Sequence, residues 1–212
     1  PLARMQVALG LAQQREGEAE NPELARIELE AERLNELIGQ LLTLSRMESA
    51  TADLQATEID LQQLLLEIAK NANYEAAEKG CNVNLASPES IMLEADPQLL
   101  RSALENIVRN AVIYTDQATS IDITVQTDAA IDHGILICIH DLGPGVPEDM
   151  LPRLFDPFVR VGEARDRQSG GYGLGLAIAE RAIHLHGGVI EAENAPGGGL
   201  IVCVRLPCRQ SK

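Results

Sequence analysis

Two glycine clusters in the chain could let the backbone approach a ligand closely. Residues 141–145 (DLGPG) follow an apolar run, so Asp141 would lie at the end of a strand. A carboxylate there can accept a hydrogen bond from an exocyclic amine, but the same residues also make a good turn, and both interpretations stay open. Residues 170–176 (GGYGLGL) precede a helical pattern, whose first N–H groups could hold phosphate. Their spacing fits neither a Walker P-loop nor a Rossmann fingerprint.

Asn106 and Asn110 are a further pair with possible ligand chemistry. They stand four residues apart in a predicted helix, so both amides lie on one face. Two amides in this position could be satisfied core groups or ligands for a hard cation. Amide oxygens suit Mg²⁺, which usually keeps several waters and bridges to substrate phosphates. Each of these signals is weak alone, and only their conjunction is specific.

Capping residues and hydrophobic periodicity predict the elements that would position these groups. Asp60 can cap a helix that ends near Glu78, and the Asp-Pro pair at 96–97 opens a helix to about Tyr114. A third helix covers about 174–186. Strands are predicted at 82–86, 91–94, 121–125, 135–139, 189–193 and 200–206, the last two joined by a glycine turn at 197–199. The strands cluster in pairs instead of alternating with helices, which favours an α+β sandwich with helices on one face of a mixed sheet.

The N-terminal part of the chain has a helical period instead. Apolar residues alternately three and four apart form two seams, one at Leu2, Met5, Leu9 and Ala12 and one at Leu24, Ile27, Ala31, Leu34, Ile38, Leu41 and Ser45. A polar break at 17–22 separates the two predicted helices, and Asn21 can cap the second. A helical hairpin with an uncovered apolar stripe is expected to pair with a second copy, as a dimeric four-helix bundle. Packing of the hairpin on the rest of its own chain is the alternative.

Composition argues against several classes of partner. Asp and Glu number 32 against 17 Lys and Arg, for a formal net charge of −15. This charge argues against nucleic acid as a partner and against docking to an anionic membrane surface. No apolar run approaches the roughly 18 residues of a membrane span, and no signal peptide is recognised. The cysteines (Cys81, Cys138, Cys203 and Cys208) form no C-x-x-C pair, so we interpret them as free thiols in a reducing compartment, not as metal or disulfide sites.

Four motifs together resemble those of sensor histidine kinases. Residues 106–114 (NIVRNAVIY) resemble the N box of that family, and 141–145 (DLGPG) resemble its first glycine box. Residues 155–158 (FDPF) resemble its F box, and 171–176 (GYGLGL) resemble its second glycine box. All four stand in family order at family spacing, and 162–171 (GEARDRQSGG) looks like the lid of the envelope-stress (Cpx-type) branch.

The resemblance implies a division of the chain into four parts. Residues 1–48 would be the dimerisation and histidine-phosphotransfer hairpin, and the small polar residues 49–57 would be a linker. Residues 58–207 would be an α/β sandwich that binds ATP, of the type shared by histidine kinases, gyrase and Hsp90. Residues 208–212 would be a tail.

The resemblance also implies roles for individual residues. Asp141 would accept the adenine amino group, and Asn106 and Asn110 would place Mg²⁺ and the phosphates. Phe155 and Phe158 would anchor a lid that closes over ATP. The other nucleotide-binding residues that it implies are Tyr114, Gly143, Gly145, Arg160, Gly171, Gly173, Leu174, Gly175 and Leu176.

The chain departs from the family pattern at three places. The phosphoacceptor histidine would stand five residues before Pro1, so we expect it upstream of this sequence, and His133, His140, His184 and His186 are interpreted as structural. Ile113 occupies an N-box position where relatives often carry Lys or Arg. A lid arginine (Arg160, Arg165 or Arg167) could compensate, unless these arginines are a solvated charge run. Leu142 replaces the usual Asn or Asp, which we expect to matter little.

The implied function is that of the core of a two-component sensor histidine kinase. It would pass the γ-phosphate of ATP to a histidine and then to an aspartate in the receiver domain of a response regulator. The resemblance implies a homodimer through 1–48, on the cytoplasmic side of the bacterial inner membrane, attached through segments absent from this chain. A dimeric nucleotide-binding module without catalytic output is the alternative. A stand-alone ATPase fits less well, because Glu105 lies one residue round the helix from the Asn face.

Overall fold

A computed structural model of the chain describes residues 22–48, 54–87, 90–128, 134–161 and 172–207. The chain divides into two compact units, Pro1–Ser45 and Arg46–Lys212. Within the described ranges, no helix is long and apolar enough to cross a bilayer.

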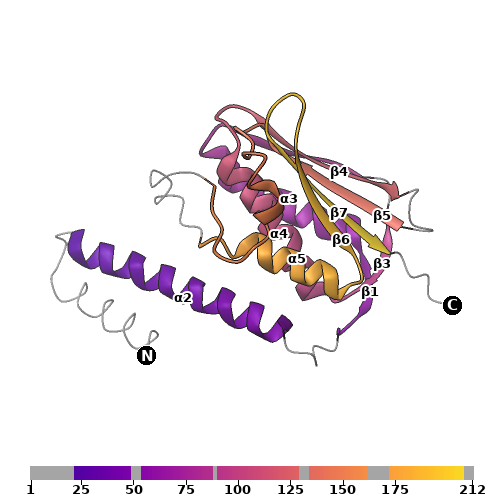
Figure 1. Cartoon of the computed structure of the whole chain (residues 1–212), viewed down its shortest axis with the longest axis horizontal. Coiled ribbons are helices and arrows are strands. Elements are labelled where there is room, and N and C mark those ends of the chain that lie inside the picture. The colour runs from indigo at the N-terminus through magenta and orange to yellow at the C-terminus, as the bar shows by residue number, and fades with distance from the viewer. Residues whose placement is uncertain (1–21, 49–53, 88–89, 129–133, 162–171, 208–212) are drawn as a thin grey trace. The chain divides into compact units, whose positions relative to one another are not determined.

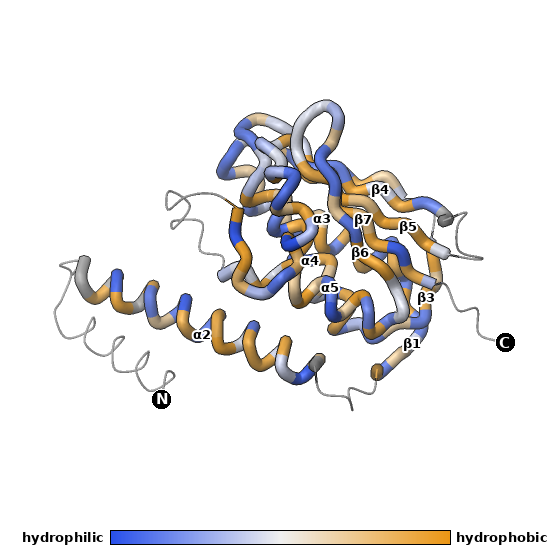
Figure 2. The backbone as a smooth tube through the Cα atoms, viewed as in Figure 1, coloured by the Kyte–Doolittle hydropathy of each residue, from blue (hydrophilic) through white to orange (hydrophobic). Residues whose placement is uncertain are grey.

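The helix α2 (Pro22–Glu48) confirms the second helix predicted for the N-terminal part. Apolar and polar residues alternate along it, as the colours of α2 in Figure 2 show. The seam residues with large exposed side chains are Ile27, Leu34, Ile38 and Leu41. The first predicted helix and the capping residue Asn21 lie outside the described residues.

The larger unit contains a two-layer sandwich, which confirms the predicted fold class (Figure 1). The helices α3 (Leu61–Ala77), α4 (Pro97–Tyr114) and α5 (Gly175–Leu185) form one layer. The other layer is a mixed five-stranded sheet of order β2-β4-β5-β7-β6. Its strands are β2 (Asn82–Ala86), β4 (Ser120–Asp128), β5 (Gly134–His140), β6 (Val189–Asn194) and β7 (Leu200–Pro207). Helix α4 is central in its layer, because it contacts both α3 and α5.

The period-two pattern of the strands explains how the sheet buries one face. In the antiparallel β4–β5 pair, Ile123 lies opposite Ile139 and Val125 lies opposite Ile137, and all four side chains are buried. Strand β2 joins β4 in parallel, whereas β7 pairs antiparallel with both β5 and β6. The core therefore lies between this face of the sheet and the three helices.

Aspartates begin α3 and α4, as predicted. Oδ1 of Asp60 accepts hydrogen bonds from the backbone N–H groups two and three residues ahead, at 2.9 and 3.2 Å. Oδ1 of Asp96 does the same at 3.0 and 3.1 Å, and a proline follows it. The far end of α5 is tied to this second cap, since Nε2 of His186 accepts the backbone N–H of Asp96 at 3.0 Å. This contact agrees with a structural role for His186.

Strand β1 (Thr57–Asp60) is an element that the sequence did not predict. It begins at the last residue of the predicted linker and pairs antiparallel with β3 (Met92–Ala95), where Ile59 lies opposite Leu93. These two strands form a separate small sheet, so β2 and β3 do not pair although they are close in sequence. Ile59 is the single apolar residue of this strand, so hydrophobic alternation does not reveal it.

The interpretation of all the cysteines as free thiols is wrong for two of them. Cys138 and Cys203 form a disulfide between β5 and β7, where the register places them directly opposite each other. They are 65 residues apart in sequence, so only the strand pairing brings them together. Cys81 is free and buried, as expected, and Cys208 lies outside the described residues.

Candidate functional site

Asp141 follows β5 directly, and its side chain is buried. Its Oδ1 accepts hydrogen bonds from the backbone N–H groups of Gly143 at 2.9 Å and Leu200 at 3.3 Å. Among the described residues both bonds fall on Oδ1, which leaves Oδ2 for a donor on a ligand. Burial raises the pKa of Asp141 above its ordinary value, and the two N–H groups oppose that rise. A buried and oriented carboxylate of this kind suits the recognition of a single amino group.

The loop after Asp141 approaches other backbone so closely that two positions require glycine. A Cβ at Gly143 would lie 2.2 Å from the carbonyl oxygen of Tyr114. Gly145 has a φ of +72°, and a Cβ there would lie 2.7 Å from Oδ1 of Asn194. The fold thereby brings the first predicted glycine box against the end of the predicted N box.

Asn194 and Thr115 hold this loop, and neither was predicted from the sequence. Oδ1 of Asn194 accepts the N–H of Val146 at 2.8 Å, and its Nδ2 donates to the Val146 carbonyl at 2.7 Å. The hydroxyl of the buried Thr115 accepts the N–H of Leu142 at 3.3 Å. Asn194 lies far from the loop in sequence, so only the tertiary structure reveals its contact.

The side chain of Asn106 faces the start of α5. Its Nδ2 donates to the carbonyl of Ser102 at 2.8 Å. Its Oδ1 lies toward Gly175, where a Cβ would be only 2.8 Å away. Asn110 stands one turn further along α4 and is partly buried, like Asn106. The two predicted cation ligands therefore share one face of α4, and the first of them lies against the second glycine box.

Lys79, another residue not predicted from the sequence, caps the C-terminal end of α4. Its Nζ donates to the carbonyl of Val112 at 2.8 Å and also to that of Ile113. A cation here satisfies terminal carbonyls and interacts favourably with the negative end of the helix dipole. Ile113, the departure from the N-box pattern, is thus held through its backbone.

Helix α5 begins without a side-chain cap among the described residues. Leu174 occupies its N-cap position, and this side chain is fully buried and has no polar group. The first N–H groups of α5 have no acceptor within the helix, and a helix start of this kind can bind an anion. Gly173 precedes them with a φ of +72°, and Leu176 follows in the first turn. Gly171, another predicted member of this box, lies outside the described residues.

The predicted F box contacts the second glycine box through its backbone. The N–H of Phe158 donates to the carbonyl of Gly173 at 2.8 Å. Phe158 has a φ of 65° and a side chain that is 60% exposed, whereas Phe155 is partly buried. A non-glycine residue in this conformation costs of order 1 kcal/mol and persists only where its surroundings hold it.

The structure describes one of the three arginines predicted in the lid. Arg160 is described and exposed. Arg165 and Arg167 belong to the segment 162–171, which lies outside the described residues.

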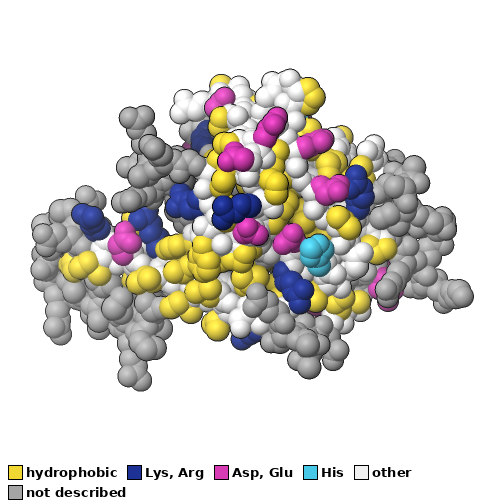
Figure 3. Space-filling model, viewed as in Figure 1, with side chains coloured by type: hydrophobic (Ala, Val, Ile, Leu, Met, Phe, Trp, Pro, Cys, Tyr) yellow, Lys and Arg dark blue, Asp and Glu magenta, His cyan; other side chains and the backbone are white. Residues whose placement is uncertain are grey.

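A groove of about 320 Å³ lies between α3 and α4, next to Asn106. Its polar lining includes Asn71 and Glu75 of α3 and Glu105 and Arg109 of α4. On the face seen in Figure 3, acidic and basic side chains are interspersed, and hydrophobic atoms lie between them.

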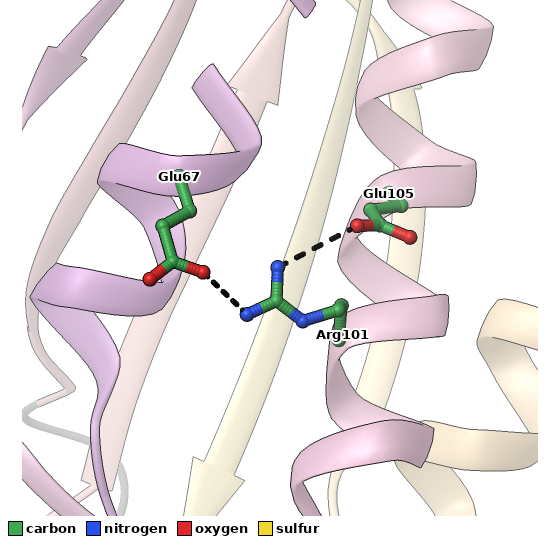
Figure 4. Close-up of polar contacts among 3 residues, drawn as sticks. All are labelled: Glu67, Arg101 and Glu105. Atoms are coloured by element: carbon green, nitrogen blue, oxygen red, sulfur yellow. Dashed lines mark hydrogen bonds and ion pairs between the residues drawn. The ribbon is translucent and has the colours of Figure 1, made fainter. Parts of the chain in front are cut away.

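Arg101 joins α3 and α4 beside this groove (Figure 4). Its guanidinium lies 2.6 Å from Oε2 of Glu67 and 3.7 Å from Oε1 of Glu105. The hydrogen bond from Arg101, and then its charge, lower the pKa of Glu67. All three side chains are well exposed, so the cluster contributes little to stability.

A comparison of the sequence with known protein families identifies the family of the chain, and the sandwich with its glycine loops is consistent with it. The pattern of the histidine kinase-, DNA gyrase B-, and HSP90-like ATPases matches residues 95–210. The chain therefore belongs to this family of ATPase domains.

Individual relatives narrow the comparison to sensor histidine kinases. Sensor histidine kinase CpxA of Escherichia coli (strain K12) is 43% identical over 208 residues, which are 98% of this chain and 44% of that protein. Full-length ShkA in complex with AMPPNP has a TM-score of 0.79 at 26% identity, over 99% of this chain and 46% of that one. The catalytic domain of histidine kinase ThkA, in a nucleotide-free form, has a TM-score of 0.63 at 26% identity, over 73% of this chain and 96% of that one. The chain thus spans less than half of the CpxA sequence that it matches.

Proposed function

We propose that the chain is the core of a sensor histidine kinase that binds ATP with Mg²⁺. The observation that carries this proposal is the start of α5, which lacks a side-chain cap among the described residues and lies beside Oδ1 of Asn106. It offers backbone donors to phosphate and an oxygen donor to a cation at one place. The carboxylate of Asp141, with Oδ2 available among the described residues, provides the second recognition point.

Each candidate residue then has a defined task. Oδ2 of Asp141 accepts the adenine amino group, and Gly143 and Gly145 let the ring approach. The N–H groups around Gly173, Leu174 and Gly175 bind phosphate. The residues that border or close the site are Tyr114, Phe155, Phe158, Arg160, Gly171 and Leu176.

Asn106 and Asn110 would hold Mg²⁺ through their amide oxygens. The donor set fits a hard cation, because Nδ2 of Asn106 is occupied by the Ser102 carbonyl and its oxygen faces α5. When bound, the ion supplies charge neutralisation at the phosphates. The chain itself positions the amides and the phosphate-binding N–H groups, and positioning with charge stabilisation is most of what phosphoryl transfer requires.

The intact protein would then act in two-component signalling. Its relatives are named sensor histidine kinases. The γ-phosphate would pass to a histidine of the hairpin and then to an aspartate in the receiver domain of a response regulator. Residues 1–48 would form the hairpin, 49–57 the linker, 58–207 the ATP-binding domain and 208–212 a tail. The site of action would be the cytoplasmic side of the bacterial inner membrane.

The homodimer would form through 1–48. The exposed seam residues of α2 support this proposal, because an apolar stripe of this length requires a covering surface. Replacing both Leu34 and Leu41 by Glu should give monomers in light scattering. Exchanging Glu32 and Glu36, which lie off the seam, for Gln is the matched control. A dimer that survives the Leu34→Glu/Leu41→Glu change would exclude this seam as the interface.

An assay with [γ-³²P]ATP tests the catalytic proposal. The chain is compared with a version extended at its N-terminus by the histidine-bearing segment of the family. Acid-labile label on the extended version alone supports the kinase.

Ile113, an apolar residue at a position where the family often carries a cation, favours the second candidate, a nucleotide-binding module without output. ATP binding by both forms without any label would support that candidate.

A further inference from the structure

Cys138 and Cys203 cross-link β5, the central strand of the sheet, to its neighbour β7. Strand β5 lies between β4 and β7, and the disulfide joins β5 to β7 at directly opposite positions, with Cα atoms 4.1 Å apart. The proposed nucleotide chemistry does not use either sulfur atom.

Both cysteines lie on the face of the sheet away from the helices. On β5, Ile137 and Ile139 are buried on the helix side, and Cys138 between them points the other way and is only partly buried. On β7, Cys203 stands in the same relation to the buried residues on either side of it. A partly exposed pair on a helix-free face is accessible to a small thiol reagent, which exchange requires.

The cross-link lies close to the backbone that positions Asp141. Three residues after Cys138, the N–H of Asp141 donates to the carbonyl of Leu200 at 3.0 Å. Three residues before Cys203, the N–H of Leu200 donates to Oδ1 of Asp141 at 3.3 Å. A Cβ at the neighbouring Gly199 would lie only 1.8 Å from the carbonyl oxygen of Asp141. The same strand pair that the disulfide joins therefore sets the orientation of the carboxylate.

We propose that Cys138 and Cys203 form a reversible oxidation site that tunes nucleotide affinity. The inference rests on the proposed function, in which Asp141 recognises adenine and the chain works in a reducing compartment. In such a compartment disulfides are mostly transient and regulatory. The oxidised pair holds the end of β5 against the start of β7 and keeps Asp141 oriented. The reduced pair lets these two strand ends separate more easily, so the nucleotide must order them on binding.

The chemistry is thiol–disulfide exchange with a low-molecular-weight disulfide. The thiolate of one cysteine attacks a sulfur of the reagent and releases one small thiolate, which takes up a proton. The second cysteine thiolate then attacks the first Sγ, so the Cys138–Cys203 bond forms and the second small thiol leaves. Two electrons pass from the protein to the reagent, and excess small thiol reverses each step.

The first experiment measures the oxidation itself. The chain is equilibrated at a series of ratios of reduced to oxidised glutathione, quenched by alkylation and mapped by mass spectrometry. We expect Cys138 and Cys203 to change together from alkylated to linked across the series, while Cys81 stays alkylated. A Cys138–Cys203 bond that neither forms nor opens over the series would overturn the proposal, whatever the chain does with nucleotide.

The second experiment titrates ATP into the oxidised and the reduced chain by calorimetry. We expect affinity at least threefold weaker in the reduced chain. The Cys138→Val/Cys203→Val variant should match the reduced chain under both conditions, and Cys81→Ala should keep the full redox response. Equal affinity of the two wild-type forms would overturn the inference and leave the proposed function standing. Absence of ATP binding in both forms would overturn the proposed function together with the inference.

Discussion

The starts of α4 and α5 solve the same physical problem in opposite ways. Both helices present backbone N–H groups that no helical carbonyl can satisfy. At α4, the carboxylate of Asp96 accepts two of them. At α5, the buried Leu174 stands in the cap position and accepts none. This contrast supports our proposal that the start of α5, which has no side-chain cap among the described residues, binds an external anion.

The same contrast appears between Asp96 and Asp141, both of which are buried. Oδ1 of Asp96 serves the helix, and its Oδ2 accepts the N–H of Gln55 at 3.1 Å. Asp141 uses only Oδ1 among the described residues. Both oxygens of Asp96 therefore bond to the backbone, whereas Oδ2 of Asp141 has no such bond among the described residues although burial disfavours the charge of that carboxylate.

The largest expected effect follows from removing the charge of Asp141. Asp141→Asn should weaken ATP binding roughly tenfold to a hundredfold, since hydrogen bonds to charged groups contribute about 1.5–3 kcal/mol. The domain should stay folded. Calorimetric titration measures the affinity, and Asp122→Asn on the neighbouring strand is the control. Unchanged ATP affinity in Asp141→Asn would show that Asp141 does not bind the adenine amino group.

The raised pKa of Asp141 adds a prediction about stability. The folded chain keeps a proton on Asp141 at pH values where the unfolded chain has lost it. The ionisation therefore costs stability as the pH rises from the ordinary pKa to the raised one. Asp141→Asn should be at least as stable as the wild type at pH 7, and its advantage should disappear as the pH falls below that range. Chemical denaturation at a series of pH values checks this, and an Asn variant less stable at pH 7 would contradict it.

Removing the cap of α4 should lower stability and leave ATP affinity nearly unchanged, which is the opposite of what we expect from Asp141→Asn. Asp96→Ala removes the acceptor of three backbone N–H groups, those of Gln98, Leu99 and Gln55, and should lower the free energy of unfolding by about 1–2 kcal/mol. Affinity for ATP should stay within about twofold of the wild-type value, a change of about 0.4 kcal/mol, because the hydrogen bonds of the Asp96 side chain among the described residues reach neither Asp141 nor the start of α5. A large loss of affinity in a chain that is still folded would show that the two helix starts are not independent.

A smaller effect is expected from crowding the start of α5. In Gly175→Ala the new Cβ would meet Oδ1 of Asn106 at 2.8 Å and displace that amide. The loss of about one hydrogen bond should weaken Mg-ATP binding roughly fivefold, corresponding to about 1 kcal/mol. Gly39→Ala, where a Cβ would meet nothing within 4 Å, is the matched control. If Gly175→Ala binds Mg-ATP as well as the wild type does, Asn106 is not a ligand of the cation.

The smallest effect concerns the exposed cluster on α3 and α4. Because Arg101 lowers the pKa of Glu67, any stability from this pair is present at neutral pH and is lost as the pH falls through the lowered pKa. The pair is exposed, so Glu67→Gln should leave both the thermal midpoint and ATP affinity unchanged at pH 7. A clear loss of ATP affinity would instead connect the α3–α4 groove to the nucleotide site.

Much of the fold was predictable because its signals are local. The caps at Asp60 and Asp96, the period-two strands and the stop after α3 all depend on neighbouring residues, and the structure confirms them. The four motifs likewise depend on short spacing. Strand β1 was missed because it has a single apolar residue, Ile59, and therefore shows no hydrophobic alternation.

The amino-acid sequence by itself determined which segments become helices and strands, because propensity, capping and alternation act over a few residues. Only the tertiary structure decided which segments meet. It placed Tyr114 against Gly143, turned Oδ1 of Asn106 toward Gly175, and joined Cys138 to Cys203. Contacts between residues far apart in the chain depend on strand register and on the packing of helices against the sheet, which no local pattern specifies.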